Sequence, residues 1–214
     1  GYVADPVGVV SRLPHVPANG SVMRTVPCGL FHFWNEEEVM ENASLFSRTT
    51  HSDPLCTFTS VCASLLISRI IQTRLGLIPG YDIDETIQTA LTKVTLNERE
   101  RSEVDRYMGC RKVEELKLCE LDKIGYCLKA FGAAVLCLRL SLGISESIEL
   151  IIPEGGDADT NGAVVGGLIG ASVGLSRIPK HLLLRMFNGQ WLYNEAAAFL
   201  AVNGITAPPS PFLE

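Results

Sequence analysis

The sequence predicts an all-α protein built as a bundle of many helices. Apolar residues recur at helical spacing along most of the 214 residues, and residues that favour helix starts precede one apolar segment after another. Runs that alternate between apolar and polar residues are scarce. Residues 149–152 (E-L-I-I) could be read as a strand, but Pro153 directly after them favours a helix end. Short polar loops between the helices predict a compact multi-helix bundle.

The first predicted helices begin with recognisable capping residues. Asn35 precedes three glutamates, whose negative charge suits a helix N-terminus. Asp53 followed by proline predicts a second helix, which extends to about Leu75 and ends at a glycine. Asp82 begins a third helix that reaches about Val94.

The region 97–120 carries interleaved arginines and glutamates. Asn97 and Glu100 have the spacing of a capping box. We expect a solvated helix followed by a variable loop. A basic patch that binds a partner is a weaker alternative, because the acidic residues offset the basic ones.

The C-terminal half contains further helical segments. The expected ranges are 122–140, a short helix capped by Ser145 and ending at 152, the range 160–175, a short helix opened by Pro179, and 190–202. Glycines at 162, 166, 170 and 174 recur at every fourth residue, which predicts close packing of one helix against another. Residues 1–205 are expected to form one domain, and residues 206–214 a proline-rich tail.

Composition and charge exclude several classes of protein. With 47% hydrophobic and 20% charged residues, the chain is not intrinsically disordered. A net charge of −6 argues against general electrostatic binding to nucleic acid or to an anionic membrane. The uncharged, glycine-rich stretch of residues 160–176 is marginal in length for a bilayer and begins with polar residues, so we expect no membrane span.

The cysteines and the opening residues predict a cytoplasmic location. The seven cysteines show no C-x-x-C pair, which favours buried reduced thiols and argues against a zinc site. Residues 1–8 lack the charged and apolar regions of a signal peptide. The sequence does not predict an oligomeric state.

The most informative segment is the acidic loop at residues 155–161, G-G-D-A-D-T-N. Two glycines permit a sharp turn, and Asp157, Asp159 and Thr160 offer the oxygen ligands that Mg²⁺ or Ca²⁺ prefers. A competing interpretation is that Asp159 or Thr160 only caps the next helix. An EF-hand is rejected, because its twelfth position, counted from Asp157, is Leu168 instead of glutamate.

Two other segments carry weaker signals. Asn19, Gly20 and Ser21 form a tight polar turn that is suited to a phosphate or ribose, although Asn-Gly is also simply a common turn. His51 precedes the helix that Asp53 begins, where an anion can bind; alternatively, Thr50 or Asp53 caps the helix and the histidine has no role.

Taken in order, the three segments resemble the ADP-ribosylglycohydrolase family, which includes the dinitrogenase reductase-activating glycohydrolases. Residues 19–24 (N-G-S-V-M-R) are similar to its N-G-x-x-M-R motif, and residues 50–54 (T-H-S-D-P) to its T-H-x-D/N-P element. The acidic loop is similar to its G-G-D-x-D-T-N signature. The resemblance covers nearly the whole chain and is weakest over residues 95–120 and in the tail.

The resemblance implies an orthogonal all-α bundle with two Mg²⁺ ions in a cleft. By this resemblance, Asp157, Asp159 and Thr160 would be metal ligands. Asn19, Gly20 and Ser21 would line the phosphates and ribose of ADP-ribose, His51 would contact ADP-ribose, and Arg24 would support the loop. Partners would be ADP-ribose or an ADP-ribosylated protein.

The family's earlier motifs, G-D-x-x-G and T-D-D-T, do not occur in this sequence. We therefore expect the chain to correspond to the C-terminal portion of the family fold, without its N-terminal helices, and the catalytic acid to lie outside it. The expected activity is Mg²⁺-dependent hydrolysis of ADP-ribose from a protein side chain or small acceptor, when that N-terminal half completes the protein. The alternatives are an inactive crystallin-like or ADP-ribose-binding paralogue of the same fold, or a plain helical scaffold whose acidic loop only caps a helix. The sequence does not decide whether the acceptor is arginine, serine, a small ester or poly(ADP-ribose).

Overall fold

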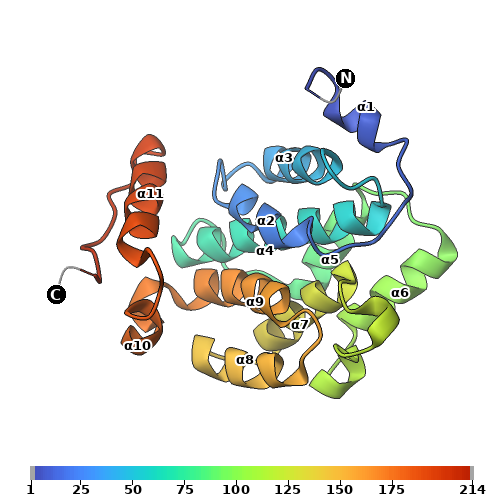
Figure 1. Cartoon of the computed structure of the whole chain (residues 1–214). Helices are drawn as coiled ribbons and strands as arrows, with labels where there is room; N and C mark the ends of the chain where they lie inside the picture. The colour runs from blue at the N-terminus through green and yellow to red at the C-terminus, as the bar shows by residue number, and fades with distance from the viewer. Residues whose placement is uncertain (1–2, 213–214) are drawn as a thin grey trace. The chain divides into compact units, whose positions relative to one another are not determined.

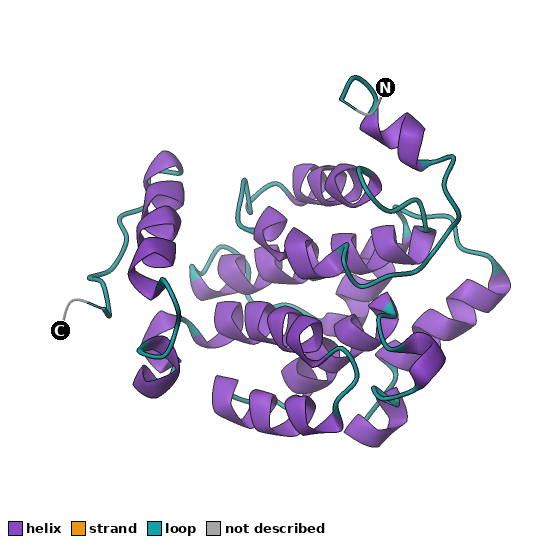
Figure 2. Cartoon of the chain, viewed as in Figure 1, coloured by secondary structure: helices purple, strands orange, loops and turns teal. Residues whose placement is uncertain are grey.

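A computed structural model describes residues 3–212 and confirms the all-α fold (Figures 1 and 2). Within these residues no strand forms, and the only β-type pairing is an isolated bridge between Ala18 and Tyr126. The α-helices are α1 (Pro6–Val10), α2 (Val22–Thr25), α3 (Glu36–Arg48), α4 (Pro54–Arg74), α5 (Ile83–Leu91), α6 (Glu98–Met108), α7 (Cys127–Arg139), α8 (Ile144–Ile151), α9 (Ala158–Val173), α10 (Lys180–Leu183) and α11 (Gly189–Val202).

The chain divides into two compact units. The first extends to Ser172 and the second begins at Val173. Every segment singled out in the sequence for its chemistry lies in the first unit. The proposed boundary between a domain ending at 205 and a tail from 206 stays a prediction, and its outermost residues, 1–2 and 213–214, lie outside the described part of the chain.

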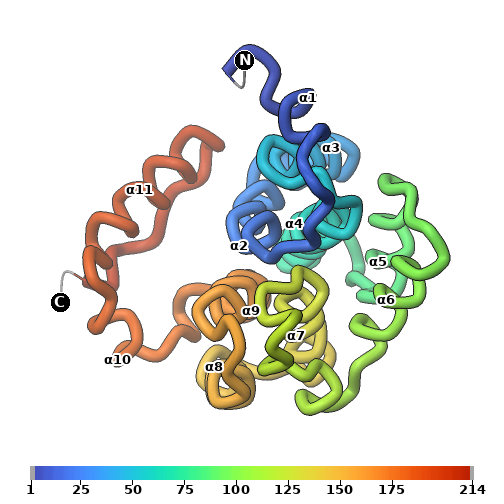
Figure 3. Tube along the Cα trace, turned by 45° about the vertical axis from the view of Figure 1, so that its right-hand side comes forward, coloured from blue at the N-terminus to red at the C-terminus, as the bar shows by residue number. Residues whose placement is uncertain are grey.

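The core of the first unit is built around α4. This helix is apolar and buried around almost its whole circumference, and it contacts α2, α3, α5 and α7 (Figure 3). Among the described helices, α4 alone is long and apolar enough to cross a bilayer, but 89% of that stretch is buried inside the protein. Such burial is typical of a core helix.

The predicted capping residues are confirmed at four helix starts. Asn35 accepts from the backbone N–H of Glu38 at 3.3 Å, and Asp53 from that of Leu55 at 2.9 Å. Asp82 caps α5 in the same way. Asn97 and Glu100 form a complete capping box at the start of α6. Local hydrogen bonding therefore sets these boundaries, as the sequence indicated.

Other predicted boundaries are wrong by one to five residues. Helix α7 begins at Cys127 instead of Asp122, because the segment before it pairs with the loop around Ala18. The backbone N–H of Cys127 donates to Pro17, and that of Asn19 to Gly125. Helix α8 begins at Ile144 after Gly143, so Ser145 is not its cap. Helix α5 ends at Leu91, three residues before the expected end.

The segment expected to be a loop after α6 is partly helical and partly buried, and its variability stays a prediction. Residues 113–116 form a 3-10 helix (η2), and Leu116 and Leu118 are at most 2% exposed. The flanking charged residues masked these apolar anchors in the sequence. This segment supports the acidic loop, as described below.

The glycine stripe of α9 does not form the expected packing face. No atom lies within 4 Å of the positions that a Cβ of Gly166 or Gly170 would occupy. The close approach is instead at Gly167, where a Cβ would lie 2.7 Å from a methyl carbon of Val26. A second contact is at Gly162, against Ile152. Close packing is therefore confirmed at one position of the stripe, Gly162, and at Gly167 outside it, but not along the whole stripe.

The second unit contains α10, α11 and the proline-rich end. Tyr193 on α11 donates its hydroxyl to the carbonyl of Pro208, and Ser210 donates to Gln190 at 2.9 Å. The described residues of the tail, 206–212, form no helix or strand, and hydrogen bonds connect them to α11.

Candidate functional site

Three segments that are far apart in the sequence meet in the first unit. The amide nitrogen of Asn19 donates to the Asp157 carboxylate at 2.7 Å, across 138 positions of sequence. His51 approaches the turn at Gly20, where a Cβ would lie 3.4 Å from its Nε2 atom. The Thr160 hydroxyl lies 3.6 Å from the sulfur of Met23. The polar turn, the histidine and the acidic loop therefore form one cluster.

Asp157 occupies the N-cap position of α9. Its carbonyl accepts from the backbone N–H of Asn161 at 2.9 Å, which is the first turn of hydrogen bonding in the helix. The hypothesis that Asp159 or Thr160 provides the cap is therefore wrong, since both are already helical. Asp159 accepts from the backbone N–H of Thr160 at 2.8 Å.

The Asp157 carboxylate is held in its charged form. Partial burial raises the pKa of Asp157, but hydrogen bonds with Asp159, Asn19 and Thr160 outweigh this effect, so the pKa lies below its ordinary value. An ionised carboxylate beside a second carboxylate is an attractive environment for a cation.

The acidic loop rests on the segment that precedes α7. Gly155 and Gly156 have φ of +69° and +70°, a conformation that favours glycine. A Cβ on Gly156 would lie 2.3 Å from the carbonyl oxygen of Leu118, and the Cys119 thiol donates to the carbonyl of Glu154. Backbone conformation and close approach thus both require the second glycine.

A buried lysine holds that supporting segment in place. The side chain of Lys129 on α7 is fully buried, and its ammonium donates to the carbonyl of Lys117 and pairs with Glu120 at 3.0 Å. Lys129 therefore links the core helix α7 to the segment on which the acidic loop rests.

Buried hydrogen bonds hold the polar turn in place. Ser21 is fully buried, and its hydroxyl donates to the carbonyls of Ala18 and Cys56 at 3.4 and 3.5 Å. The Cys56 thiol in turn donates to Ala18 at 3.2 Å. The Ser21 side chain therefore supports the turn, which leaves its backbone as the part that can face a ligand. Asn19 is 6% exposed, and its side chain faces Asp157.

His51 is held by its neighbours, and of the two alternative caps Asp53, not Thr50, caps the helix that follows. The Thr50 hydroxyl lies 2.7 Å from His51 Nδ1, and the Arg24 guanidinium donates to the same hydroxyl. Arg24 thus contacts the segment before α4, and its support of the polar turn stays a prediction. Burial, and then the positive charge of Arg24, lower the pKa of His51 below its ordinary value of 6.5.

We predict that an NMR titration of the free protein gives His51 a pKa below 6.5 and that Arg24→Gln raises it partway, because burial remains. The folded state then binds this proton more weakly than the unfolded state. The contribution of His51 to stability therefore decreases as the pH falls below 6.5. An unshifted pKa in the wild type would contradict this description.

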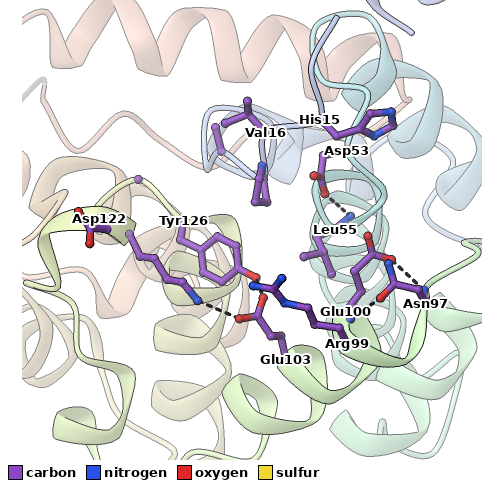
Figure 4. Close-up of a pocket in the computed structure, with 14 residues that line it drawn as sticks. His15, Val16, Asp53, Leu55, Asn97, Arg99, Glu100, Glu103, Asp122 and Tyr126 are labelled. Atoms are coloured by element: carbon purple, nitrogen blue, oxygen red, sulfur yellow. Dashed lines mark hydrogen bonds and ion pairs between the residues drawn. The ribbon is translucent and has the colours of Figure 1, made fainter. Parts of the chain in front are cut away.

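A cavity of about 660 Å³ adjoins the polar turn (Figure 4). Ala18 and Gly125, which flank the Asn19 backbone contact, are part of its wall. Glu103 accepts from the Tyr126 hydroxyl and from Lys123 at 2.8 Å. Burial raises the pKa of Asp53, at the opposite side of the cavity. Both apolar and charged residues line the cavity, and most of the charged ones are already paired or engaged in helix caps.

The residues of the acidic loop fit a hard divalent cation. Two carboxylates and a hydroxyl provide the oxygen ligands that a hard divalent cation prefers. Across residues 3–212, no group of three or more histidine, cysteine or acidic side chains is arranged to hold a metal. The loop would therefore supply part of a coordination sphere.

Sequence reasoning missed three supporting residues. Lys129 was detectable as the single charged residue inside the apolar run 127–138. Cys56 and Leu118 gave no local signal, because their roles depend on contacts with distant segments. All seven cysteines are free thiols, and Cys56 lies within hydrogen-bonding reach of Cys127.

Comparison with known proteins identifies the family of the chain. No curated protein matches the chain. The profile of the ADP-ribosylglycohydrolase family matches residues 8–207, a range that contains all three converging segments and nearly the whole described structure. The chain therefore belongs to the ADP-ribosylglycohydrolase family.

Proposed function

We propose that this chain binds ADP-ribose at the cluster formed by the Asn19 turn, His51 and the acidic loop, and that Mg²⁺ is required. The observation that carries the proposal is the Asn19–Asp157 hydrogen bond, together with the contact between His51 and Gly20. These contacts unite the three family motifs in one place. The turn and the histidine are suited to phosphates, and the neighbouring carboxylates are suited to a cation. Together they fit a nucleoside diphosphate sugar.

Each residue has a distinct proposed role. Asp157, Asp159 and Thr160 would hold Mg²⁺, two ions being expected in a complete family site. The backbone of the turn at Gly20 and Ser21 would bind phosphate or ribose, and Asn19 would orient the Asp157 carboxylate. The neutral imidazole of His51 would donate or accept one hydrogen bond to ADP-ribose. The bound cation would orient ribose hydroxyls and lower the pKa of water near the anomeric carbon.

The proposed reaction is hydrolysis of the bond between ADP-ribose and a protein side chain or small acceptor. The family assignment supports a hydrolase in general terms. We place the protein in the cytoplasm, and we propose that neither nucleic acid nor membrane is a partner, from the charge and thiol content.

The reaction is tested by release of ADP-ribose from an ADP-ribosylated protein, with Mg²⁺ and with a chelator. Mg²⁺-dependent release that is lost in Asp157→Ala is the expected result. Asp122→Ala, an acid in the neighbouring cavity, is the matched control and should retain release. Binding of ADP-ribose without any release would instead favour the inactive, crystallin-like alternative.

A further inference from the structure

Asn161 has a buried amide side chain for which the described residues provide no hydrogen-bond partner. It lies on α9 directly after the proposed ligand Thr160, and it is 1% exposed. Within the described residues, neither its amide nitrogen nor its amide oxygen has a hydrogen-bond partner. Burying such a group without a partner destabilises a protein, and native structures contain few examples.

The direction of the helix places this amide next to the acidic loop. Side chains on an α-helix lean towards its N-terminus, so each one covers the turn before its own Cα atom. Asp157 stands four residues before Asn161 and therefore lies on the same face. The Asn161 amide thus lies over the first turn of α9, on the side from which Asp157 reaches Asn19.

Packing alone does not require asparagine here. The buried face of α9 continues from Asn161 with Val164, Val165 and Leu168, each at most 1% exposed. A leucine at position 161 would extend this apolar face and would remove two unpartnered polar atoms. Asn161 therefore interrupts the apolar face of α9 at the end of the helix that adjoins the carboxylates.

We propose that Asn161 is a positioning residue of the cation site: its Nδ2 atom donates a hydrogen bond to the Asp157 carboxylate when a divalent cation is bound. This proposal rests on the proposed function, because it needs a cation at the acidic loop. With Asn19 already donating to one oxygen of Asp157, a second donor fixes the orientation of the carboxylate. Outer hydrogen bonds of this kind orient ligands and tune metal affinity.

The first test measures Mn²⁺ binding by electron paramagnetic resonance, because Mn²⁺ accepts the same oxygen ligands as Mg²⁺. Asn161→Leu should weaken Mn²⁺ affinity by about 10- to 100-fold. In the absence of cation, its melting temperature should be unchanged or raised by about 2–4 °C, since an unpartnered buried amide has been removed. A residue that only supported the fold would instead lower the melting temperature.

The second variant separates a hydrogen-bond donor from a direct ligand. Asn161→Asp keeps the size and the acceptor oxygen but loses the N–H donor. We expect weaker Mn²⁺ binding in spite of the added negative charge. Tighter binding would overturn the donor role, since it would mean that position 161 ligates the cation itself. Because this readout needs only folded protein and Mn²⁺, it also serves if Asn161→Leu does not fold.

The control is Tyr107→Phe. Tyr107 is fully buried on α6, and its hydroxyl also has no hydrogen-bond partner among residues 3–212. None of the residues of the cluster lies on α6. This variant should keep wild-type Mn²⁺ affinity. If the wild-type protein binds no Mn²⁺, both the cation in the proposed function and the role of Asn161 fail. If the wild type binds and Asn161→Leu binds equally well, the role of Asn161 alone is overturned.

Discussion

Gly156→Ala should reduce the free energy of unfolding by about 3 kcal/mol or more. Two independent effects act at this position. The backbone has φ of +70°, which costs an alanine conformational energy, and the new Cβ would lie 2.3 Å from the carbonyl oxygen of Leu118. Because the obstacle is backbone and not the end of a flexible side chain, the acidic loop itself must move. Chemical denaturation measures the loss.

The matched control is Gly166→Ala, in helix α9, which directly follows the acidic loop. No atom lies within 4 Å of the new Cβ, and its φ lies outside the left-handed region. Alanine should stabilise the helix there by about 0.5–1 kcal/mol. Equal effects of the two substitutions would contradict the description of Gly156 as a position fixed by close contact.

Asn19→Asp should reduce the free energy of unfolding by about 2–4 kcal/mol at pH 7 and abolish detectable ADP-ribose binding. The Asn19 side chain is 6% exposed and donates to Asp157 at 2.7 Å. The substitution replaces a donor by a second carboxylate, so a hydrogen bond becomes a like-charge contact. At acidic pH the loss of stability should shrink, because protonating one carboxyl group restores a hydrogen bond.

Asn35→Asp is the control for the chemistry of this substitution. Asn35 is the N-cap of α3, it is exposed, and aspartate is an equally good cap there. Its unfolding free energy should change by less than about 0.5 kcal/mol. A mild effect of Asn19→Asp comparable to that of Asn35→Asp would show that Asn19 and Asp157 are not coupled.

The sequence predicted the parts of the fold that local chemistry determines. Asn35, Asp53 and Asp82 each cap a helix through their own side chain, and Asn97 with Glu100 forms its box within one turn. Such signals need no knowledge of distant residues. The start of α7 was misplaced because Gly125 and Cys127 form hydrogen bonds with the loop around Ala18, more than a hundred positions away.

The site shows the same division between local and distant information. The three motifs were recognisable from residue types and spacing. The double role of Asp157, as helix cap and as partner of Asn19, depends on tertiary structure and could not be predicted locally. The role of Leu118 beneath Gly156 was concealed by the surrounding charges. The glycine pattern of α9 was real, yet only Gly167, outside the four-residue repeat, meets a neighbouring side chain as closely as 2.7 Å.

The most direct test of a single Mg²⁺-dependent ADP-ribose site is titration calorimetry with ADP-ribose, performed with and without Mg²⁺. The wild-type chain is compared with an Asp157→Ala/Asp159→Ala variant, after a folding check on both, and with Asp122→Ala as a control. We predict binding that requires Mg²⁺, is retained in Asp122→Ala and is lost in the double variant. Equal binding with and without Mg²⁺, binding retained by the double variant, or no binding by the folded wild-type chain would contradict the account.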